Sequence, residues 1–457
     1  MIIDVSENLK TLANLTNKMG YKTYLVGGYV RNALLGLSSQ DVDIASAMPI
    51  NKLETLCKKA GYETEVVNKK LGTVQIRKDN EVYEYTAFRK EVYDQTGKHS
   101  PEEVTFIDDY KVDASRRDFT VNSIYYDIVE DKILDTFNGC EHIRKKMLKT
   151  VLEPEIVFTD DGLRILRLIR FAAELDFKPE RHTLVKAKEY ASKVADISGE
   201  RILKEIKTAV NGGLKYQLKN DTHGNVVKYY NKLNLWQHMF KGNFVNFKVK
   251  QSGKLYKAYL KSDGSCRFIA FMCLVLNNYI KVKSAENNIA FSVSQILGAT
   301  GLKESNKNIQ EIYDAYVFVQ NLIYGTEKEL ITNVNAIKFN NLTFETKNYL
   351  RFVNAKMVDK INTKVSEMKK QDVPFSEEEL RITSTDLIEK VKVNNRCVSK
   401  IKNTLFEMCV KNMIVNDYDV LMEQAKFLNE KLEKILSGSK EKLVKNVNLT
   451  DDVVEVE

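Results

Sequence analysis

Several patterns that would identify particular protein classes are missing from this 457-residue chain. Its six cysteines are scattered, with no C-x-x-C pair and no histidine at ligand spacing, which argues against a zinc site or a disulfide framework. The longest apolar run, Phe268 to Leu276, is too short to span a bilayer, and the N-terminus lacks the basic and then apolar profile of a signal peptide. We therefore expect a cytoplasmic protein with no membrane partner.

Proline is also scarce, at five residues, and neither an internal repeat nor a low-complexity segment occurs. With 29% charged residues the composition is that of an ordinary globular protein, long enough for two to four structural units. The net charge of +8 makes an anionic partner plausible, although a lysine-rich proteome explains it equally well.

What is present begins with residues 24 to 44. Tyr24 to Val26 predicts a buried strand that runs into Gly27-Gly28, where the missing side chains let backbone N–H groups approach a bulky group. Arg31 then lies in a short helical pattern. These residues predict a strand, a tight turn and a short helix in sequence.

The same stretch ends in Asp41-Val42-Asp43-Ile44. If the two aliphatic residues pack inward on a strand, alternation points both carboxylates to the opposite face. Neighbouring carboxylates repel each other unless a cation lies between them, and Mg²⁺ is the natural candidate. A D-x-D sequence alone is more often an exposed turn; the preceding glycines and arginine are what favour a metal here.

Helical and strand patterns alternate through the rest of this region, which predicts an α+β head. The expected helices are 4–20 and 51–60, and the expected strands are 64–68, 72–77 and 81–88, in a βαβ-β-β layout. Glu84 alternates with two tyrosines, so beside the D-x-D strand it would supply a third acid. A solvent-facing glutamate is an equally good interpretation.

Two polar segments follow. Residues 89–105 show no period and predict a mobile connection of functional length. Beyond it, Arg116-Arg117-Asp118 with Thr120 and Asn122 combines groups that suit phosphate and ribose, although a helix cap with a surface ion pair explains them too. A hairpin is expected over 127–137.

From about residue 141 the patterns become almost entirely helical. Thr159 or Asp160 is expected to cap a helix from Asp161 to Leu175, in which Leu166, Ile169 and Ala173 form a core stripe. In the same helix Asp161, Arg164 and two further arginines recur every three residues. An ion pair between Asp161 and Arg164 is the simpler interpretation of this spacing. A second capped helix is expected at 198–207, and 449–457 is expected to be a frayed acidic tail.

Taken in order, these segments resemble the bacterial class II CCA-adding tRNA nucleotidyltransferases and the related poly(A) polymerases. Five motifs carry the resemblance: Gly27, Gly28, Val30 and Arg31 with Asp41 and Asp43; Arg116 to Asn122; Asp135 with Gly139; Asp160, Asp161 and Arg164; and Glu200, Arg201, Ile202 and Glu205. Weaker similarity extends to 382–389.

The resemblance implies an α+β fold in which a polymerase beta-like nucleotidyltransferase βα head is followed by an all-helical neck, body and tail, arranged like a seahorse. The expected parts are a catalytic head at 1–140, a nucleobase-recognising neck at 141–207, a body at 208–320 and a tRNA-binding tail at 321–457. It leaves the oligomeric state open.

It also implies a site. Asp41 and Asp43 would hold two Mg²⁺ ions, with Glu84 as a supporting catalytic acid. Other residues correspond to nucleotide contacts: Gly28, Arg31, Arg117, Asp118, Asn122, Asp161, Arg164, Arg167 and Arg170. Asp161 and Arg164 would accept cytosine and adenine and repel uracil and guanine, whose edges present a carbonyl to the acid.

Three departures from the family pattern stand out. Asn32 replaces the usual aspartate after Arg31, which could loosen that arginine or alter metal affinity. Asp160 replaces the usual glutamate, and Lys98 stands where arginine is common.

Within the family we expect complete CCA addition to the 3' end of the tRNA acceptor arm, from CTP and ATP. The strand at 71–75 resembles CCA enzymes, lacks the basic segment of poly(A) polymerases, and precedes a full-length loop. A poly(A) polymerase, an A-adding enzyme and a non-catalytic RNA-binding protein remain alternatives.

Overall fold

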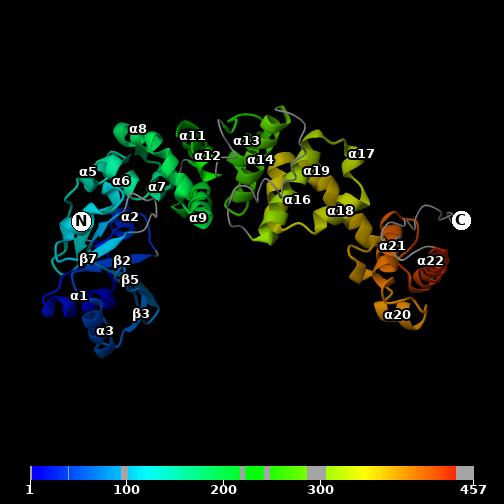
Figure 1. The fold of residues 1–457 in the computed structure, drawn as a ribbon, viewed down its shortest axis with the longest axis horizontal. Coiled ribbons are helices and arrows are strands. Elements are labelled where there is room, and N and C mark those ends of the chain that lie inside the picture. The colour runs from blue at the N-terminus through cyan, green and yellow to red at the C-terminus, as the bar shows by residue number, and fades with distance from the viewer. Residues whose placement is uncertain are drawn as a thin grey trace. The chain divides into compact units, whose positions relative to one another are not determined.

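The computed structural model describes residues 3–39, 41–93, 101–216, 222–240, 247–285 and 305–438. Its backbone divides into two compact units, Met1–Gln310 and Glu311–Glu457. The first contains a β-sheet followed by helices and the second is helical, so the predicted fold class, a sheet-containing head followed by helices, is confirmed (Figure 1). The finer division into head, neck, body and tail stays a prediction.

A seven-stranded sheet forms the N-terminal part of the first unit, drawn in blue and cyan in Figure 1, with strand order β3-β4-β5-β2-β1-β8-β9. Its strands are β1 (Thr23–Val26), β2 (Val42–Ser46), β3 (Glu63–Asn68), β4 (Thr73–Lys78), β5 (Glu81–Ala87), β8 (Tyr125–Asp127) and β9 (Lys132–Leu134). The β2–β5 pair is parallel and the other five pairs are antiparallel. The three strands expected over 64–88 and the hairpin at 127–137 are therefore confirmed.

The connection between the first two strands differs from the expected βαβ unit. β1 and β2 are adjacent and antiparallel, joined through α2 (Gly28–Leu34). A helix of seven residues advances the chain by only about 10 Å. The chain reverses direction after this helix, so β2 runs antiparallel beside β1.

Alternating burial explains how the sheet is covered. In β5 the side chains of Tyr83 and Tyr85 are buried while Glu84 between them is exposed. Helices α1 (Glu7–Lys18) and α3 (Ile50–Lys59) pack together and contact the sheet at β1 and β3. Apolar residues are thus buried between helices and sheet, and Glu84 points away from that core.

The segment expected to be an irregular connection begins and ends in strands. β6 (Arg89–Val92) pairs antiparallel with β7 (Glu103–Phe106) in a separate two-stranded sheet. Sequence pattern missed it because Arg89 and Glu91 are polar, yet both are largely buried in an ion pair of 2.6 Å. Residues 94–100, including Lys98, lie outside the described part of the chain.

Helices surround and follow the sheet in the first unit. They are α4 (Tyr110–Ser115), η1 (Thr120–Asn122), α5 (Gly139–Arg144), α6 (Pro154–Asp160), α7 (Leu163–Leu175), α8 (Arg181–Glu189), η2 (Ala191–Asp196), α9 (Gly199–Val210), α10 (Gly212–Lys215), α11 (Gly224–Lys232), α12 (Trp236–Met239), α13 (Lys254–Lys261) and α14 (Arg267–Ala285). Two short strands, β10 (Met147–Leu148) and β11 (Lys178–Pro179), pair in parallel among them. Ser198 caps α9 as predicted, by accepting from the Arg201 N–H.

Helix α7 begins later than predicted. The predicted stripe of Leu166, Ile169 and Ala173 is fully buried. Asp161, however, has an extended backbone, and its Oδ1 accepts a hydrogen bond of 3.0 Å from the N–H of Leu163. The aspartate therefore terminates α6 and leads into α7, instead of forming the first turn of one long helix.

The second unit is built from α16 (Asn306–Tyr324), whose first turn precedes the boundary, α17 (Glu327–Leu330), α18 (Asn333–Asn340), α19 (Phe344–Lys370), η3 (Glu377–Glu379), α20 (Ser384–Glu389), α21 (Val398–Val410) and α22 (Tyr418–Gly438). Thr383 and Asp386 form a capping box at α20. The expected acidic tail at 449–457 lies outside the described ranges. None of the helices described in either unit combines the length and apolar composition of a membrane span.

Candidate active site

A cleft of ≈ 980 Å³ opens in the first unit. It lies where the turn after β1, the exposed side of β2 and β5, the β6–β7 hairpin and helices α7 and α9 meet. All twelve residues that the sequence singled out as catalytic or nucleotide-binding line it: Gly28, Arg31, Asp41, Asp43, Glu84, Arg117, Asp118, Asn122, Asp161, Arg164, Arg167 and Arg170. Residues from three of the five motifs are thus brought to one site, together with Glu84 of β5 and two further arginines of α7.

Three acids lie on one side of this cleft. Asp43 on β2 is the register partner of Glu84 on β5, and Asp41 is exposed immediately before β2. Burial raises the pKa of Asp43 to about 6, with the like charge of Glu84 adding to the effect and Arg117 opposing it. A carboxyl group held in this way gains most when a cation neutralises it.

Gly27 gives the acids room. Its φ of +68° suits glycine, and a Cβ at this position would lie 3.3 Å from Oδ2 of Asp43 and 3.5 Å from Nη1 of Arg117. The turn therefore brings backbone directly against an acid and an arginine. The carboxylate oxygens of the three acids are donors that suit a hard divalent cation. They do not all lie within 4.8 Å of one another.

One group of three candidate metal ligands in the described ranges does meet that distance, and it lies elsewhere. It consists of Glu153, Glu155 and His182, of which Glu153 and His182 are exposed and Glu155 is half-buried. The ammonium of Lys186 is already 2.8 Å from Glu155. This group is separate from the cleft, whose lining includes none of its members.

Arg31 is buried at 3% exposure and is held by neutral groups. Its Nε and Nη2 donate to Oδ1 of Asn32 at 3.1 and 2.9 Å, and its Nη1 donates to Oδ1 of Asn122 at 2.5 Å. Nη2 also donates to the hydroxyl of Tyr216 at 3.3 Å. Asn32, which replaces the family's aspartate, therefore still accepts hydrogen bonds from two nitrogens of Arg31.

Asp118 connects Arg167 to the η1 turn. Its Oδ2 accepts from Nε of Arg167 at 2.8 Å, and its Oδ1 accepts from the N–H of Phe119 and the amide of Asn122. Although burial opposes ionisation, Arg167 and these donors hold the pKa of Asp118 at about 2. The carboxylate is therefore a fixed anion at neutral pH.

Three guanidinium groups surround the ring of Phe171 on α7. The Cζ atoms of Arg31, Arg167 and Arg170 lie 5.1, 5.2 and 4.1 Å from its centroid. An aromatic face attracts cations, so the ring offsets part of their mutual repulsion. Arg170 is further held by Glu174 at 2.8 Å and by Glu205, from the fifth motif, at 2.7 Å.

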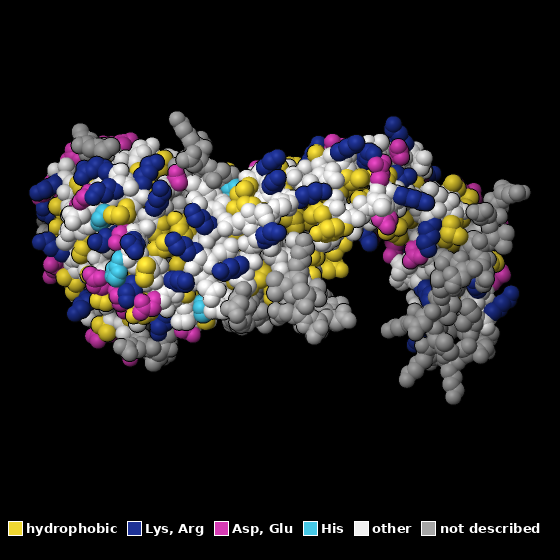
Figure 2. Space-filling view, turned by 90° about the horizontal axis from the view of Figure 1, so that it is seen from above, with side chains coloured by type: hydrophobic (Ala, Val, Ile, Leu, Met, Phe, Trp, Pro, Cys, Tyr) yellow, Lys and Arg dark blue, Asp and Glu magenta, His cyan; other side chains and the backbone are white. Residues whose placement is uncertain are grey.

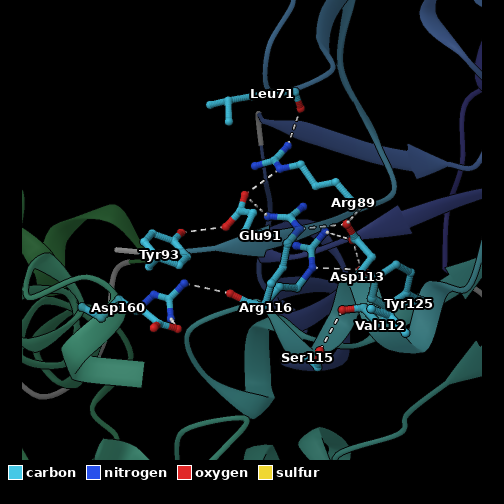
Figure 3. Close-up of polar contacts among 12 residues, drawn as sticks. Leu71, Arg89, Glu91, Tyr93, Val112, Asp113, Ser115, Arg116, Tyr125 and Asp160 are labelled. Carbon is cyan, nitrogen blue, oxygen red and sulfur yellow. Dashed lines mark hydrogen bonds and ion pairs between the residues drawn. The ribbon is translucent and has the colours of Figure 1, made fainter. Parts of the chain in front are cut away.

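A second polar network supports the other end of the cleft (Figure 3). Asp113, fully buried, accepts from the Arg89 N–H and the Arg116 Nε, and pairs with Arg117 at 3.4 Å. Burial alone would raise the pKa of Asp113, but Arg116 and Arg117 hold it below its usual range. Glu91 accepts from Arg89 and Tyr93 and pairs with Nη1 of Arg116 at 3.4 Å, so the β6 strand is tied to the second motif.

The two predicted base-reading residues are neighbours in the cleft but are not paired with each other. Oδ2 of Asp161 accepts from Nη2 of Arg201 at 3.1 Å. Arg164 donates to the carbonyl oxygens of Arg116 and Val157, and its nearest carboxylate oxygen belongs to Asp160 at 4.0 Å. The expected Asp161–Arg164 ion pair is therefore wrong, because Asp161 precedes α7 and faces α9.

Sequence inspection missed several residues that line or support this cleft, among them Asp113, Phe171, Glu174 and Tyr216. Phe171 and Glu174 belong to the helix of spaced arginines, so a search for aromatic and acidic neighbours of those arginines could have found them. Asp113 and Tyr216 carry no such signal. Their roles depend on contacts made far along the chain.

Comparisons with known proteins agree with this geometry. Residues 23–149 match the family described as the poly A polymerase head domain. The CCA-adding enzyme of Enterococcus faecalis is 38% identical over 186 residues, 41% of this chain and 44% of that protein. The CCA-adding enzyme of Ligilactobacillus salivarius is 29% identical over 423 residues, 90% of this chain and 94% of that protein. In the match to the Enterococcus protein, the chain spans under half of the relative's length.

Two solved structures share the fold over both units. The Bacillus stearothermophilus CCA-adding enzyme in complex with CTP has a TM-score of 0.66 at 22% identity, covering 93% of this chain and 98% of that chain. The Thermotoga maritima CCA-adding enzyme complexed with tRNA has a TM-score of 0.57 at 16% identity, covering 92% and 95%. At 22% and 16% sequence identity, these comparisons show that the chain shares the fold of the two structures.

Proposed function

The chain belongs to the nucleotidyltransferase family that includes the class II CCA-adding enzymes, and from that premise we propose that it adds or repairs the 3'-terminal CCA of tRNA. It would use CTP and ATP without a nucleic-acid template and work in the cytoplasm. The observation that carries this proposal is the convergence of all twelve candidate residues on one cleft. Asp43 and Glu84 come from β2 and β5, with Asp41 just before β2, and the arginines of α2 and α7 line the same cleft.

Each addition would join the 3' oxygen of the RNA to the α-phosphorus of the nucleotide and release pyrophosphate. Arg31, Arg117, Arg167 and Arg170 would bind and orient the triphosphate, since guanidinium groups match phosphate oxygens and neutralise their charge. The Gly27-Gly28 turn would let the triphosphate lie against the backbone. Asp118 and Asn122 would orient the ribose.

Asp41 and Asp43 would hold Mg²⁺, with Glu84 in support. When bound, the metal supplies Lewis-acid activation of the 3'-hydroxyl and stabilisation of the leaving pyrophosphate. The raised pKa of Asp43 means that this carboxyl binds a proton below about pH 6 and is a ligand above it.

Asp161 and Arg164 would select the base. Asp161 is oriented by Arg201 and by the N–H of Leu163, and Arg164 is fixed by two backbone carbonyls. The carboxylate would accept from the amino group of cytosine or adenine, and the guanidinium would donate to the adjacent ring acceptor. Because both side chains are held by the protein, no template strand is needed.

The anionic partner is tRNA in this proposal. Lysine and arginine side chains are distributed over the face shown in Figure 2, with fewer acidic ones between them. Such a surface suits the phosphate backbone of a nucleic acid.

An extension assay tests the proposal. Full-length protein is incubated with Mg²⁺, tRNA that lacks its 3' end, and labelled CTP alone, ATP alone or both. We expect products lengthened by up to three nucleotides, with completion only when both substrates are present. Asp43→Asn should abolish extension under the same conditions.

The other products distinguish the alternatives. A long ladder with ATP alone would indicate a poly(A) polymerase, and a single nucleotide added from ATP to tRNA ending in CC, with no use of CTP, would indicate an A-adding enzyme. No extension together with tRNA binding would indicate an RNA-binding protein and contradict the proposal.

A further inference from the structure

Tyr216 lies outside every motif of the sequence, yet its side chain lines the cleft and is only 9% exposed. It follows directly after α10, 185 residues beyond Arg31. Its hydroxyl oxygen accepts from Nη2 of Arg31 at 3.3 Å and from Nδ2 of Asn32 at 3.1 Å. A side chain from the helical region thus contacts both residues that form the centre of the first motif.

Asn32 is the link between the other two. Its oxygen accepts from Arg31 twice, and its nitrogen donates to Tyr216. An aspartate, which the family usually carries here, has no donor for the tyrosine oxygen. The amide therefore fixes the direction of the hydrogen bond to Tyr216, and this set of contacts depends on the residue in which this chain departs from its family.

Arg31 differs from Arg167 and Arg170 in the kind of group that accepts its hydrogen bonds. In the described part of the chain all four hydrogen bonds that Arg31 donates end on neutral oxygens. Arg167 and Arg170 by contrast pair directly with Asp118, Glu174 and Glu205. Burial lowers the pKa of Arg31, as expected for a cation moved from water without a carboxylate in direct contact. Such a group binds an added anion more strongly than one already neutralised.

We propose that Tyr216 is a positioning residue for nucleotide binding. Together with Asn32 it holds the Arg31 guanidinium in a clamp of neutral groups that sets its orientation and leaves its charge for the phosphates of the bound nucleotide. The inference rests on the proposed function, in which Arg31 contacts the triphosphate. Tyr216 acts through Arg31 and makes no contact with the substrate itself in this proposal.

Binding of CTP and of CMP to the full-length protein, measured by titration calorimetry with Mg²⁺ and without tRNA, tests the clamp. Tyr216→Phe removes the acceptor shared by Arg31 and Asn32 and keeps the ring. We expect the Kd for CTP to rise roughly tenfold and the Kd for CMP to change by less than about twofold, since a hydrogen bond to a charged group contributes on the order of one tenfold step. A structural role alone would not separate the two ligands.

Tyr230→Phe is the matched control, because Tyr230 is fully buried in the same unit and its hydroxyl has no hydrogen-bond partner among the described residues. It should bind both nucleotides as the wild type does. Asn32→Asp provides a second variant, since it keeps acceptors for Arg31 but adds a negative charge beside it. This variant should also weaken the binding of CTP more than the binding of CMP.

Two results would overturn the inference. Tyr216→Phe could bind CTP as tightly as the wild type, or it could lose affinity for CTP and for CMP by the same factor. If Tyr216→Phe does not fold, as judged by its unfolding midpoint, unchanged CTP binding by Asn32→Asp overturns it. Failure of the proposed function is visible separately, because the wild type itself would then not complete the CCA end in the extension assay.

Discussion

Asp43 and Glu84 are register partners on the parallel strands β2 and β5, so two carboxylates are adjacent on the side of the sheet that lines the cleft. An arrangement chosen for stability alone would place an opposite charge there. Burial and, second to it, the like charge of Glu84 raise the pKa of Asp43, so a charged carboxylate at this position costs stability. Function at this position therefore opposes the stability of the metal-free protein, and the opposition can be measured.

We expect Asp43→Asn to stabilise the metal-free protein at neutral pH. In the folded state Asp43 titrates at about 6, above its ordinary value, so the folded state binds the proton more tightly and stability falls as pH rises from about 4 to about 6. Removing the carboxylate should raise the free energy of unfolding by about 3 kcal/mol at pH 7.5 and by less than about 1 kcal/mol at pH 4. Denaturant unfolding in EDTA at both pH values measures this.

The exposed neighbour Asp41 provides the control for that experiment, since Asp41→Asn removes a charge without removing a partly buried one. Its free energy of unfolding should stay within about 0.5 kcal/mol of the wild type at both pH values. An equal stabilisation of the two variants would contradict the assignment of the effect to Asp43.

We expect Gly27→Ala to impair activity far more than stability. The added methyl would lie 3.3 Å from Oδ2 of Asp43, so that carboxylate has to shift by a few tenths of an ångström. A misplaced reacting group commonly costs roughly 100-fold in rate. Single-turnover extension of tRNA measures the loss.

Gly20→Ala separates the clash from backbone strain. Gly20 also has a positive φ, +85°, but nothing lies within 4 Å of a Cβ placed there. Both variants should lose about 1 kcal/mol of stability from strain, while only Gly27→Ala should lose activity. Equal activity in the two variants would mean that the contact with Asp43 is unimportant.

We expect Phe171→Leu to weaken nucleotide binding through its arginines. Leucine keeps an apolar side chain but loses the face that attracts three guanidinium groups. The Kd for CTP should rise about threefold to tenfold, by titration calorimetry. Phe158→Leu, at a fully buried phenylalanine of α6, should lose similar stability but bind CTP normally. If Phe158→Leu raises the Kd for CTP as much as Phe171→Leu does, the effect comes from lost packing and not from the arginines.

We expect Asp161→Ala to relax base choice more than it slows transfer. Its carboxylate is the group that would repel the carbonyl of uracil or guanine, and alanine removes that repulsion. Incorporation of UTP and GTP relative to CTP should rise at least about tenfold in an extension assay, a typical effect of one repulsive polar contact. Asp196→Ala, at an exposed aspartate of η2, should leave selection unchanged. Continued exclusion of UTP and GTP by Asp161→Ala would rule out its base-reading role.

Local patterns predicted the parts of the site that lie close together in sequence. Alternation placed Glu84 on the face away from the core, and the glycine turn with its two aspartates was evident from residues 27 to 43 alone. The stripe of α7 was equally readable, because a period of 3.6 residues repeats within one helix.

Contacts between distant segments were beyond such patterns. The pairing of Asp161 with Arg201 depends on how α9 packs beside α7, and a spacing of three residues suggested Arg164 instead. The strands β6 and β7 were missed because Arg89 and Glu91 of β6 are polar, and the contacts that hold this strand include Arg116 for the Glu91 carboxylate and Asp113 for the Arg89 N–H, more than twenty residues away. Sequence spacing carries no information about such partners.

The distance along the chain between Arg31 and Tyr216 has a consequence for biosynthesis. Every strand of the seven-stranded sheet ends by Leu134, so a growing polypeptide can emerge from the ribosome with the whole sheet translated while Tyr216 is still to be made. Until that hydroxyl docks, Arg31 lacks one of its acceptors. The growing chain therefore acquires its complete clamp only after the first helices beyond the sheet have been synthesised and packed.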